Sequence, residues 1–173
     1  MKGRFIVTGG AGFIGSNLVK ALNKRGCRDI IIVDHIDNIA KIYNLDRIRF
    51  MDFMDKEDFR KKLLEGRGPE VEGIFHLGAC SSTAETDEAY LLDNNFQYTR
   101  DLCEWSLSNG VRFVYASSAA TYGDGSKGYS DEDTVSASLE PLNPYGRSKQ
   151  KFDLWALESG AARRIAGLKY FNV

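Results

Sequence analysis

The stretch VTGGAGFIG, residues 7–15, decides the fold, because it joins a short apolar run to a segment with helical spacing. Glycines 10, 12 and 15 fit G-x-G-x-x-G, and glycines 9, 12 and 15 fit G-x-x-G-x-x-G. Such glycines permit a sharp strand-to-helix turn, close approach of a pyrophosphate to the backbone, and tight packing of helix on strand. The free N–H groups of the first helical turn can then hold an anion. The stretch therefore predicts a phosphate-binding turn.

The residues on both sides of this turn fit a β-α-β unit. Residues 4–8 (RFIVT) are mostly β-branched or aromatic, and residues 13–24 carry apolar side chains in helical spacing. The nearly continuous apolar run DIIIVD, residues 29–34, is typical of a strand that is covered on both faces. Its last residue, Asp34, stands where the fingerprint expects an acid that binds the adenosine ribose. Alternatively, Asp34 is only the polar end of a strand.

The remaining chain alternates between strand and helix patterns. We predict strands at residues 47–51, 71–77, 111–116 and 165–173, helices at 56–65, at 85–109 and from Pro144 onwards, and a loop or short helix at 35–46. Asn94 and Asn95 interrupt the long helix, so we expect one of them to make a buried or ligand-facing hydrogen bond. Residues 123–144 are rich in glycine, serine and acidic residues, so we predict a surface loop or part of a substrate rim there. The alternation predicts a Rossmann-type α/β fold, a doubly wound parallel sheet in a three-layer α/β/α arrangement.

The composition is that of an ordinary soluble protein. A length of 173 residues predicts one domain, residues 1–173. The formal net charge of −1 and the scattered basic residues argue against nucleic-acid binding. No apolar stretch approaches the ~20 residues of a membrane span, and no signal peptide is recognised, so we expect no membrane partner and a cytoplasmic location. Cys27, Cys80 and Cys103 are widely spaced, which predicts reduced thiols and no metal site.

Three residues in the second half of the chain form a candidate proton relay. Pro144 opens a helix on which Tyr145 and Lys149 share one face. A free tyrosine has a pKa of about 10 and is a poor base at neutral pH, but a neighbouring ammonium favours the phenolate. Tyr145 would take a hydroxyl proton, Lys149 would hold the nicotinamide ribose, and Ser118 would orient the substrate oxygen. Taken alone, a Tyr-x-x-x-Lys pair is more often an exposed packing pair, and the dinucleotide motif before it gives this pair its chemical meaning.

Several motifs together carry a family resemblance. They are TGGAGFIGSN (8–17), YASSAATYG (115–123), PYGRSK (144–149) and KYFNV (169–173). With them the chain resembles the extended short-chain dehydrogenases/reductases of the sugar-nucleotide epimerase type. HLGACSST (76–83), DNNFQYT (93–99) and MDKEDF (54–59) are similar to the family of ADP-L-glycero-D-manno-heptose 6-epimerases. The similarity runs over the whole chain.

The resemblance implies a set of site residues. Besides Gly9, Gly12 and Gly15, the cofactor positions are Phe13, Ile14, Asp34, His35, Lys41, Lys56, Leu77, Gly78, Ala79, Cys80, Ser81, Asn94, Lys149 and Val173. Asn172 matches a substrate contact, and Tyr145 matches the catalytic acid/base. His35 and Leu77 stand where the family commonly has asparagine and glutamate. Asp34 should repel a 2′-phosphate, whereas Lys41 matches a position associated with NADP, so we expect NADP as the cofactor, with NAD as the alternative.

The resemblance also implies a reaction. Such enzymes oxidise the heptose C6 hydroxyl, present the other face of the ketone and return the same hydride, so the expected partner is a small-molecule nucleotide-sugar. Members of the family continue past the FNV motif into a C-terminal substrate domain with a second acid/base residue. We therefore expect this chain to lack that domain and not to epimerise alone, and we expect the complete enzyme to be a homo-oligomer.

Three other functions are alternatives. Related dehydratases place an Asp-Glu pair where this chain has Ala119 and Ala120, which disfavours dehydration. A UDP-hexose 4-epimerase stays open, because the cofactor-binding half is shared and the other half selects the sugar. A non-catalytic dinucleotide-binding module is a further alternative. Ser118, Tyr145 and Lys149 together argue against such a module, because a sensor needs no proton relay.

Overall fold

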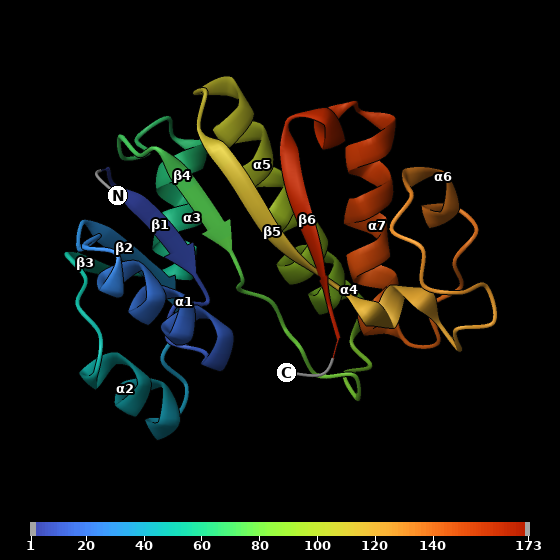
Figure 1. The fold of residues 1–173 in the computed structure, drawn as a ribbon, viewed down its shortest axis with the longest axis horizontal. Helices are drawn as coiled ribbons and strands as arrows, with labels where there is room; N and C mark the ends of the chain where they lie inside the picture. Colours follow the sequence, from blue (N-terminus) through green and yellow to red (C-terminus); the bar gives the residue numbers. More distant parts are fainter. Residues whose placement is uncertain (1–2, 172–173) are drawn as a thin grey trace. The chain divides into compact units, whose positions relative to one another are not determined.

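The computed structural model describes residues 3–171, and the chain divides into two compact units. The first unit comprises residues up to Gly78 together with Asp101–Val114, and the second comprises Ala79–Arg100 and residues from Tyr115 onwards. The strands form a six-stranded sheet in the order β3-β2-β1-β4-β5-β6 (Figure 1). This order is that of a dinucleotide-binding doubly wound sheet, so the predicted fold class is confirmed. In such a sheet the ligand crevice lies where the order reverses, here between β1 and β4.

The first unit holds the β-α-β unit predicted from the glycine turn. Its strands are β1 (Phe5–Thr8), β2 (Ile30–Asp34), β3 (Asp52–Asp55) and β4 (Gly73–His76). The pairs β1/β2, β1/β4 and β2/β3 are all parallel. Helix α1 (Phe13–Lys24) lies on one face of these strands and α3 (Lys56–Leu64) on the other, as Figure 1 shows. Because helices cover both faces, β1 and β2 are buried along their whole length.

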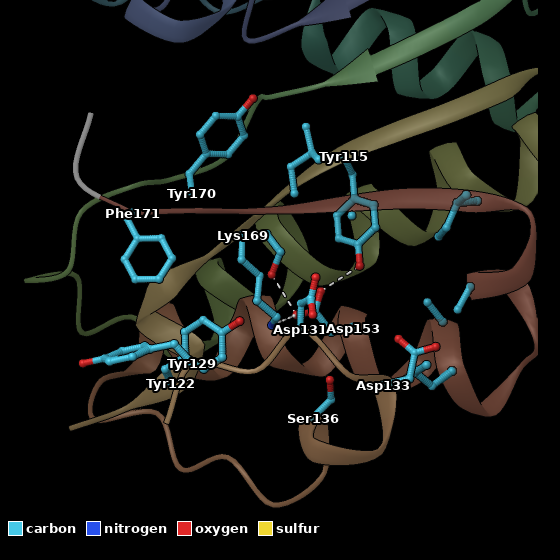
Figure 2. A pocket seen from close by; sticks show the side chains of 17 residues that line it. Tyr115, Tyr122, Tyr129, Asp131, Asp133, Ser136, Asp153, Lys169, Tyr170 and Phe171 are labelled. Carbon is cyan, nitrogen blue, oxygen red and sulfur yellow. Dashed lines mark hydrogen bonds and ion pairs between the residues drawn. The ribbon is translucent and has the colours of Figure 1, made fainter. Parts of the chain in front are cut away.

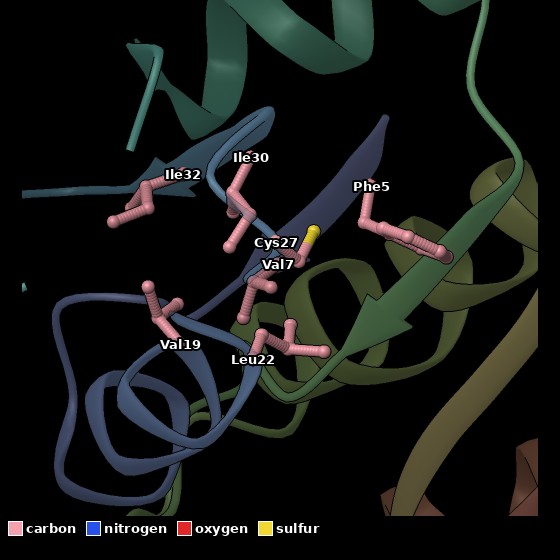
Figure 3. Close-up of a cluster of buried hydrophobic side chains, with 7 residues drawn as sticks. All are labelled: Phe5, Val7, Val19, Leu22, Cys27, Ile30 and Ile32. Atoms are coloured by element: carbon pink, nitrogen blue, oxygen red, sulfur yellow. The ribbon is translucent and has the colours of Figure 1, made fainter. Parts of the chain in front are cut away.

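An apolar cluster fixes α1 against the strands. Figure 3 shows its members, which are Phe5, Val7, Val19, Leu22, Cys27, Ile30 and Ile32. Full burial of one such aliphatic side chain contributes about 1.5–3 kcal/mol. The cluster therefore holds the first turn of α1 beside the carboxyl end of β1, where the glycine turn lies.

The predicted third strand is present, but its predicted bounds are wrong. Residues 47–51 form no strand, and β3 begins at Asp52, which is the residue opposite Ile31 of β2. Ile48 and Phe50 produced the strand-like alternation, but they pack against the apolar cluster from the segment that precedes β3. The stretch predicted as a loop or short helix contains α2 (Ile39–Asp46), whose first turn is capped by the side chain of Asn38.

The long helix predicted for residues 85–109 consists of three pieces. They are α4 (Glu88–Leu91), the π-helical turn η1 (Leu92–Gln97) and α5 (Tyr98–Ser108). The helix begins at Glu88 because the Asp87 side chain accepts a hydrogen bond from the Tyr90 amide and caps it. Asn94 and Asn95 lie inside the π turn, so the predicted interruption is confirmed.

The remaining elements follow the predicted order with shifted ends. They are β5 (Arg112–Ser118), the 3₁₀ turn η2 (Ala119–Tyr122), α6 (Asp133–Ser136), α7 (Pro144–Glu158), the 3₁₀ turn η3 (Ala161–Arg163) and β6 (Ile165–Tyr170). Strand β5 is longer than predicted and includes Ser117 and Ser118. The predicted loop contains the short helix α6. Within residues 3–171, no helix is long and apolar enough to cross a membrane.

Candidate functional site

The glycine turn leads from β1 into α1 with little space to spare. The Gly9 amide donates to the Val33 carbonyl over 2.8 Å, and the Gly12 amide donates to the Gly9 carbonyl over 3.0 Å. Gly9 has a φ of +66°, and a Cβ added to it would lie 2.7 Å from the backbone nitrogen of Gly78. A Cβ on Gly15 would overlap the Gly9 carbonyl oxygen. Glycine is therefore required at both positions by the backbone itself.

The turn fits a dinucleotide pyrophosphate. Gly12 is the N-cap of α1 and supplies no side-chain hydrogen bond to the helix. The first amides of α1, which include those of Phe13 and Ile14, are thus left for an anion. Gly9 and Gly78 bring the ends of β1 and β4 together without side chains, so a ligand can reach the backbone at the point where the strand order reverses.

Thr8 connects the ends of these two strands, a role that the sequence analysis missed. Its hydroxyl accepts a hydrogen bond from the Gly78 amide over 3.1 Å, and its Oγ1 lies 2.6 Å from Nδ1 of His76. His76 is buried and stacks on Phe113. Because one hydroxyl serves both partners, Thr8 fixes the position of Gly78 relative to Gly9.

Asp34 is bound by the protein itself. Its Oδ2 accepts from the Ala11 amide over 2.8 Å, and its Oδ1 accepts from the His35 amide over 2.8 Å and from the Lys41 ammonium over 3.1 Å. The Lys41 ammonium also donates to the His35 carbonyl over 2.7 Å. Burial lowers the pKa of Lys41, but the bonds and charges of Asp34 and Asp37 outweigh it, so the pKa lies above its ordinary value. The carboxylate predicted to bind ribose is thus neutralised by the lysine predicted to favour NADP.

The other predicted cofactor residues of the first unit have neighbours of their own. Nδ1 of His35 lies 3.2 Å from Oδ2 of Asp55, and Lys56 pairs with Glu57 at 3.4 Å. Burial raises the pKa of Asp55, but hydrogen bonds from the Glu57 amide and from His35 prevail and lower it. The Leu77 side chain is half-buried and packs against the apolar cluster.

In the second unit, α7 and β5 carry the three residues of the predicted relay. The side chain of Asn143 accepts from the Gly146 amide over 2.7 Å and starts α7, which places Tyr145 in its first turn and Lys149 one turn later. Lys149 is only 6% exposed, and its ammonium donates to the Ala116 carbonyl of β5 over 3.0 Å. The Ser118 hydroxyl accepts from the Ala120 amide over 3.1 Å and keeps its own proton to donate.

Burial governs the protonation of Lys149. It lowers the pKa of the ammonium to about 8, and the electrostatic influence of Asp153, with a smaller one from Cys80, offsets only part of that effect. Near neutral pH the lysine is still mostly protonated. The buried Lys149 thus keeps a positive charge one helical turn after Tyr145.

Asn95, in the π turn, forms hydrogen bonds with two of the predicted site residues, Cys80 and Asn94. Its Oδ1 accepts from the Cys80 amide over 2.8 Å and from Nδ2 of Asn94 over 2.9 Å. Its Nδ2 donates to the Cys80 carbonyl and to the Ser148 hydroxyl, each over 3.0 Å. The expectation that one asparagine makes a buried hydrogen bond is thus confirmed. Ala79, next to Cys80, is half-buried and Ser81 is exposed.

The structure gathers the predicted residues in two groups, one in each unit. The first group surrounds the end of β1 and consists of Gly9, Gly12, Gly15, Asp34, Lys41 and Gly78. The second joins Lys149 to β5 next to Ser118, and joins Asn94 through Asn95 to Cys80 and α7. Asn172 and Val173 lie outside the described residues.

Comparison with known proteins finds a family and several relatives that the chain resembles. Residues 5–173 match the NAD dependent epimerase/dehydratase family. The chain is 51% identical over 170 residues to ADP-L-glycero-D-manno-heptose-6-epimerase of Nitratidesulfovibrio vulgaris, which covers 98% of this chain and 53% of that protein. The chain thus spans about half the length of the curated relatives it matches.

Two solved structures show the same likeness. ADP-L-glycero-D-manno-heptose-6-epimerase of Helicobacter pylori superposes with a TM-score of 0.81 at 26% identity, covering 99% of this chain and 56% of that one. UDP-glucose 4-epimerase of Thermus thermophilus in complex with NAD superposes with a TM-score of 0.73 at 29% identity, covering 96% and 54%.

Proposed function

Since the chain belongs to the NAD dependent epimerase/dehydratase family, we propose that it provides the cofactor-binding part of a nucleotide-sugar 6-epimerase. The proposed reaction converts ADP-D-glycero-D-manno-heptose into ADP-L-glycero-D-manno-heptose. The observation that carries the proposal is the buried ammonium of Lys149, which lies on α7 one helical turn after Tyr145 and binds a carbonyl of β5. The chain is also 51% identical to a protein named ADP-L-glycero-D-manno-heptose-6-epimerase. The relative supports the choice of sugar, and the geometry supports the chemistry.

The cofactor that we propose is NADP. A carboxylate at the end of the second strand normally favours a ribose 2′-hydroxyl and repels a 2′-phosphate. Here both oxygens of Asp34 already accept backbone amides, and the Lys41 ammonium neutralises the charge at 3.1 Å. A 2′-phosphate would therefore meet a paired carboxylate and a neighbouring ammonium instead of an unpaired negative charge. NAD is the alternative, and the family description names it.

The proposed division of labour uses one group for each proton and charge. Gly9, Gly12 and Gly15 would hold the dinucleotide, whose nicotinamide would supply the hydride acceptor and donor for C6 of the sugar. Tyr145 takes the proton of the C6 hydroxyl during oxidation and gives it back on reduction. Lys149 supports the phenolate electrostatically, and Ser118 donates a hydrogen bond to the C6 oxygen. The protein thus moves one proton and positions one oxygen.

A UDP-hexose 4-epimerase is the second candidate, because a solved 4-epimerase shares this fold at a TM-score of 0.73. The same relay would then act on C4. Dehydration has no support in the described residues after β5, because Ala119 and Ala120 of η2 carry no group that could protonate a leaving hydroxyl.

The hydride route can be tested with substrate deuterated at C6. The complete gene product is incubated with ADP-D-glycero-D-manno-heptose carrying deuterium at C6, and NMR follows both the configuration and the deuterium content. We expect the inverted product to keep its deuterium. Washout of deuterium into water would instead show epimerisation by proton abstraction, and the proposal would fail. Tyr145→Phe serves as the matched control, with cofactor bound and no product formed.

A further inference from the structure

Asp153 is a buried carboxylate at which three elements of the second unit meet. It lies on α7 one turn after Lys149 and is 6% exposed. Its Oδ1 accepts from the Tyr115 hydroxyl over 2.8 Å, and its Oδ2 accepts from the Ser117 hydroxyl and from the Lys169 ammonium, each over 2.7 Å. Figure 2 shows Tyr115 and Lys169 directed at Asp153 from the strands. The proposed reaction gives this carboxylate no direct role.

These contacts fix β5 on α7 next to the relay. Tyr115 and Ser117 project from the same face of β5, because side chains alternate along a strand. Between them lies Ala116, whose carbonyl accepts the Lys149 ammonium. Three successive residues of β5 therefore form hydrogen bonds with α7, two of them with Asp153 and one with Lys149. The next residue of the strand is Ser118.

A second connection reaches Ser118 from its other side. The Lys169 ammonium, besides binding Asp153, donates to the Thr121 hydroxyl over 2.9 Å. That hydroxyl in turn donates to the Ser118 carbonyl over 2.8 Å. Asp153 thus holds the backbone of Ser118 through β5 and through η2.

We propose that Asp153 is the positioning residue of the Tyr145–Lys149 relay. Its hydrogen bonds hold β5 and Ser118 on α7, and its negative charge keeps the buried Lys149 in the ammonium form. The inference rests on the proposed function, because it assigns Asp153 a part in the same site. In this proposal Asp153 acts on the reaction through Lys149.

The charges around Asp153 decide the sign of the effect. Lys149 on α7 and Lys169 on β6 are the cations that face it, and the Tyr115 hydroxyl faces it from β5. Asp131, in the segment before α6, lines the same pocket of about 840 Å³. Burial, together with the charges of Asp131 and Asp153, raises the pKa of the nearby Tyr122. Removing the charge of Asp153 would take away the larger of the two influences that oppose burial at Lys149, so the ammonium would lose its proton more readily.

The test is an NMR titration of Lys149 in the complete gene product labelled with [ε-¹³C]lysine, with the resonance assigned from Lys149→Met. We expect Asp153→Asn to lower the proton affinity of Lys149 by about tenfold or more. Ser117→Ala removes one hydrogen bond and leaves the charge, so its titration should match that of the wild type. Asp153→Glu should restore the wild-type midpoint. An Asp153→Asn curve that superposes on the wild-type curve would overturn the proposal.

A second variant covers the case in which Asp153→Asn does not fold. Lys169→Met keeps the carboxylate and removes the competing cation, so the proton affinity of Lys149 should rise. An unchanged or lower affinity would overturn the proposal. The titration uses no substrate, so its outcome is separate from that of the epimerisation assay. A protein that acts on a different sugar would still show the predicted shifts.

Discussion

The burial of Lys149 predicts a stability that depends on pH in a defined window. Its pKa is lowered from 10.5 to about 8 in the native chain, so between these values the unfolded chain binds more protons than the native one. The penalty for burying the ammonium is fully present below about pH 8 and vanishes above about pH 10.5. With 1.36 kcal/mol for each pH unit, the change amounts to about 3 kcal/mol. Stability should therefore rise with pH across this window relative to a chain without the ammonium.

The comparison is between the wild type and Lys149→Met. Urea unfolding followed by circular dichroism gives the free energy of unfolding of each at several pH values. We expect the free energy of unfolding of the wild type, relative to that of Lys149→Met, to rise by about 3 kcal/mol between about pH 7.5 and about pH 10.5. Lys151→Met is the matched control, because the exposed Lys151 on the same helix lies over the Phe96 ring. A wild-type to Lys149→Met difference that stays flat would show that the ammonium is not desolvated, and the reasoning would be wrong.

Three further predictions test the two groups of site residues. Gly15→Ala places a Cβ on the Gly9 carbonyl oxygen, so calorimetry should show that cofactor binding is lost. Urea unfolding should show that the free energy of unfolding falls by about 1–3 kcal/mol. Gly12→Ala, whose Cβ would lie 3.2 Å from that oxygen, should cost less, and an equal cost would contradict the packing argument. Lys41→Met should weaken NADP binding about tenfold or more and leave NAD binding unchanged; equal loss of both would mean that Lys41 only supports Asp34. Asn95→Ala removes the hydrogen bonds to the Cys80 backbone and should destabilise the chain by about 1–3 kcal/mol, with a smaller cost for Asn94→Ala; the reverse ranking would argue against the Asn95 network.

Local signals predicted the parts of the fold that depend on nearby residues. The bounds of α1, Phe13–Lys24, match the prediction, because a glycine turn and helical spacing fix both the start and the direction of a helix. The third strand was misplaced because the alternation of Ile48 and Phe50 looks the same in a strand and in a connection that packs on the core. Pairing with β2, which is a non-local contact, decides which residues form the strand.

The same limit applies to the candidate site. The sequence placed Asp34 at the cofactor, but it could not show that the Ala11 amide and the Lys41 ammonium already bind the carboxylate. Asp153 was not identified, although its spacing of one helical turn from Lys149 was visible. Its importance comes from hydroxyl and ammonium partners on two strands, and only the folded chain brings them together.

The central claim is that this chain provides the cofactor-binding part of a heptose 6-epimerase. The most direct measurement is to incubate the complete gene product separately with ADP-D-glycero-D-manno-heptose and with UDP-glucose, and to follow the sugar configuration by NMR. We expect a mixture of the two C6 epimers of the heptose, formed without net consumption of cofactor, and no change in UDP-glucose. Conversion of UDP-glucose to UDP-galactose with the heptose left unchanged would contradict it.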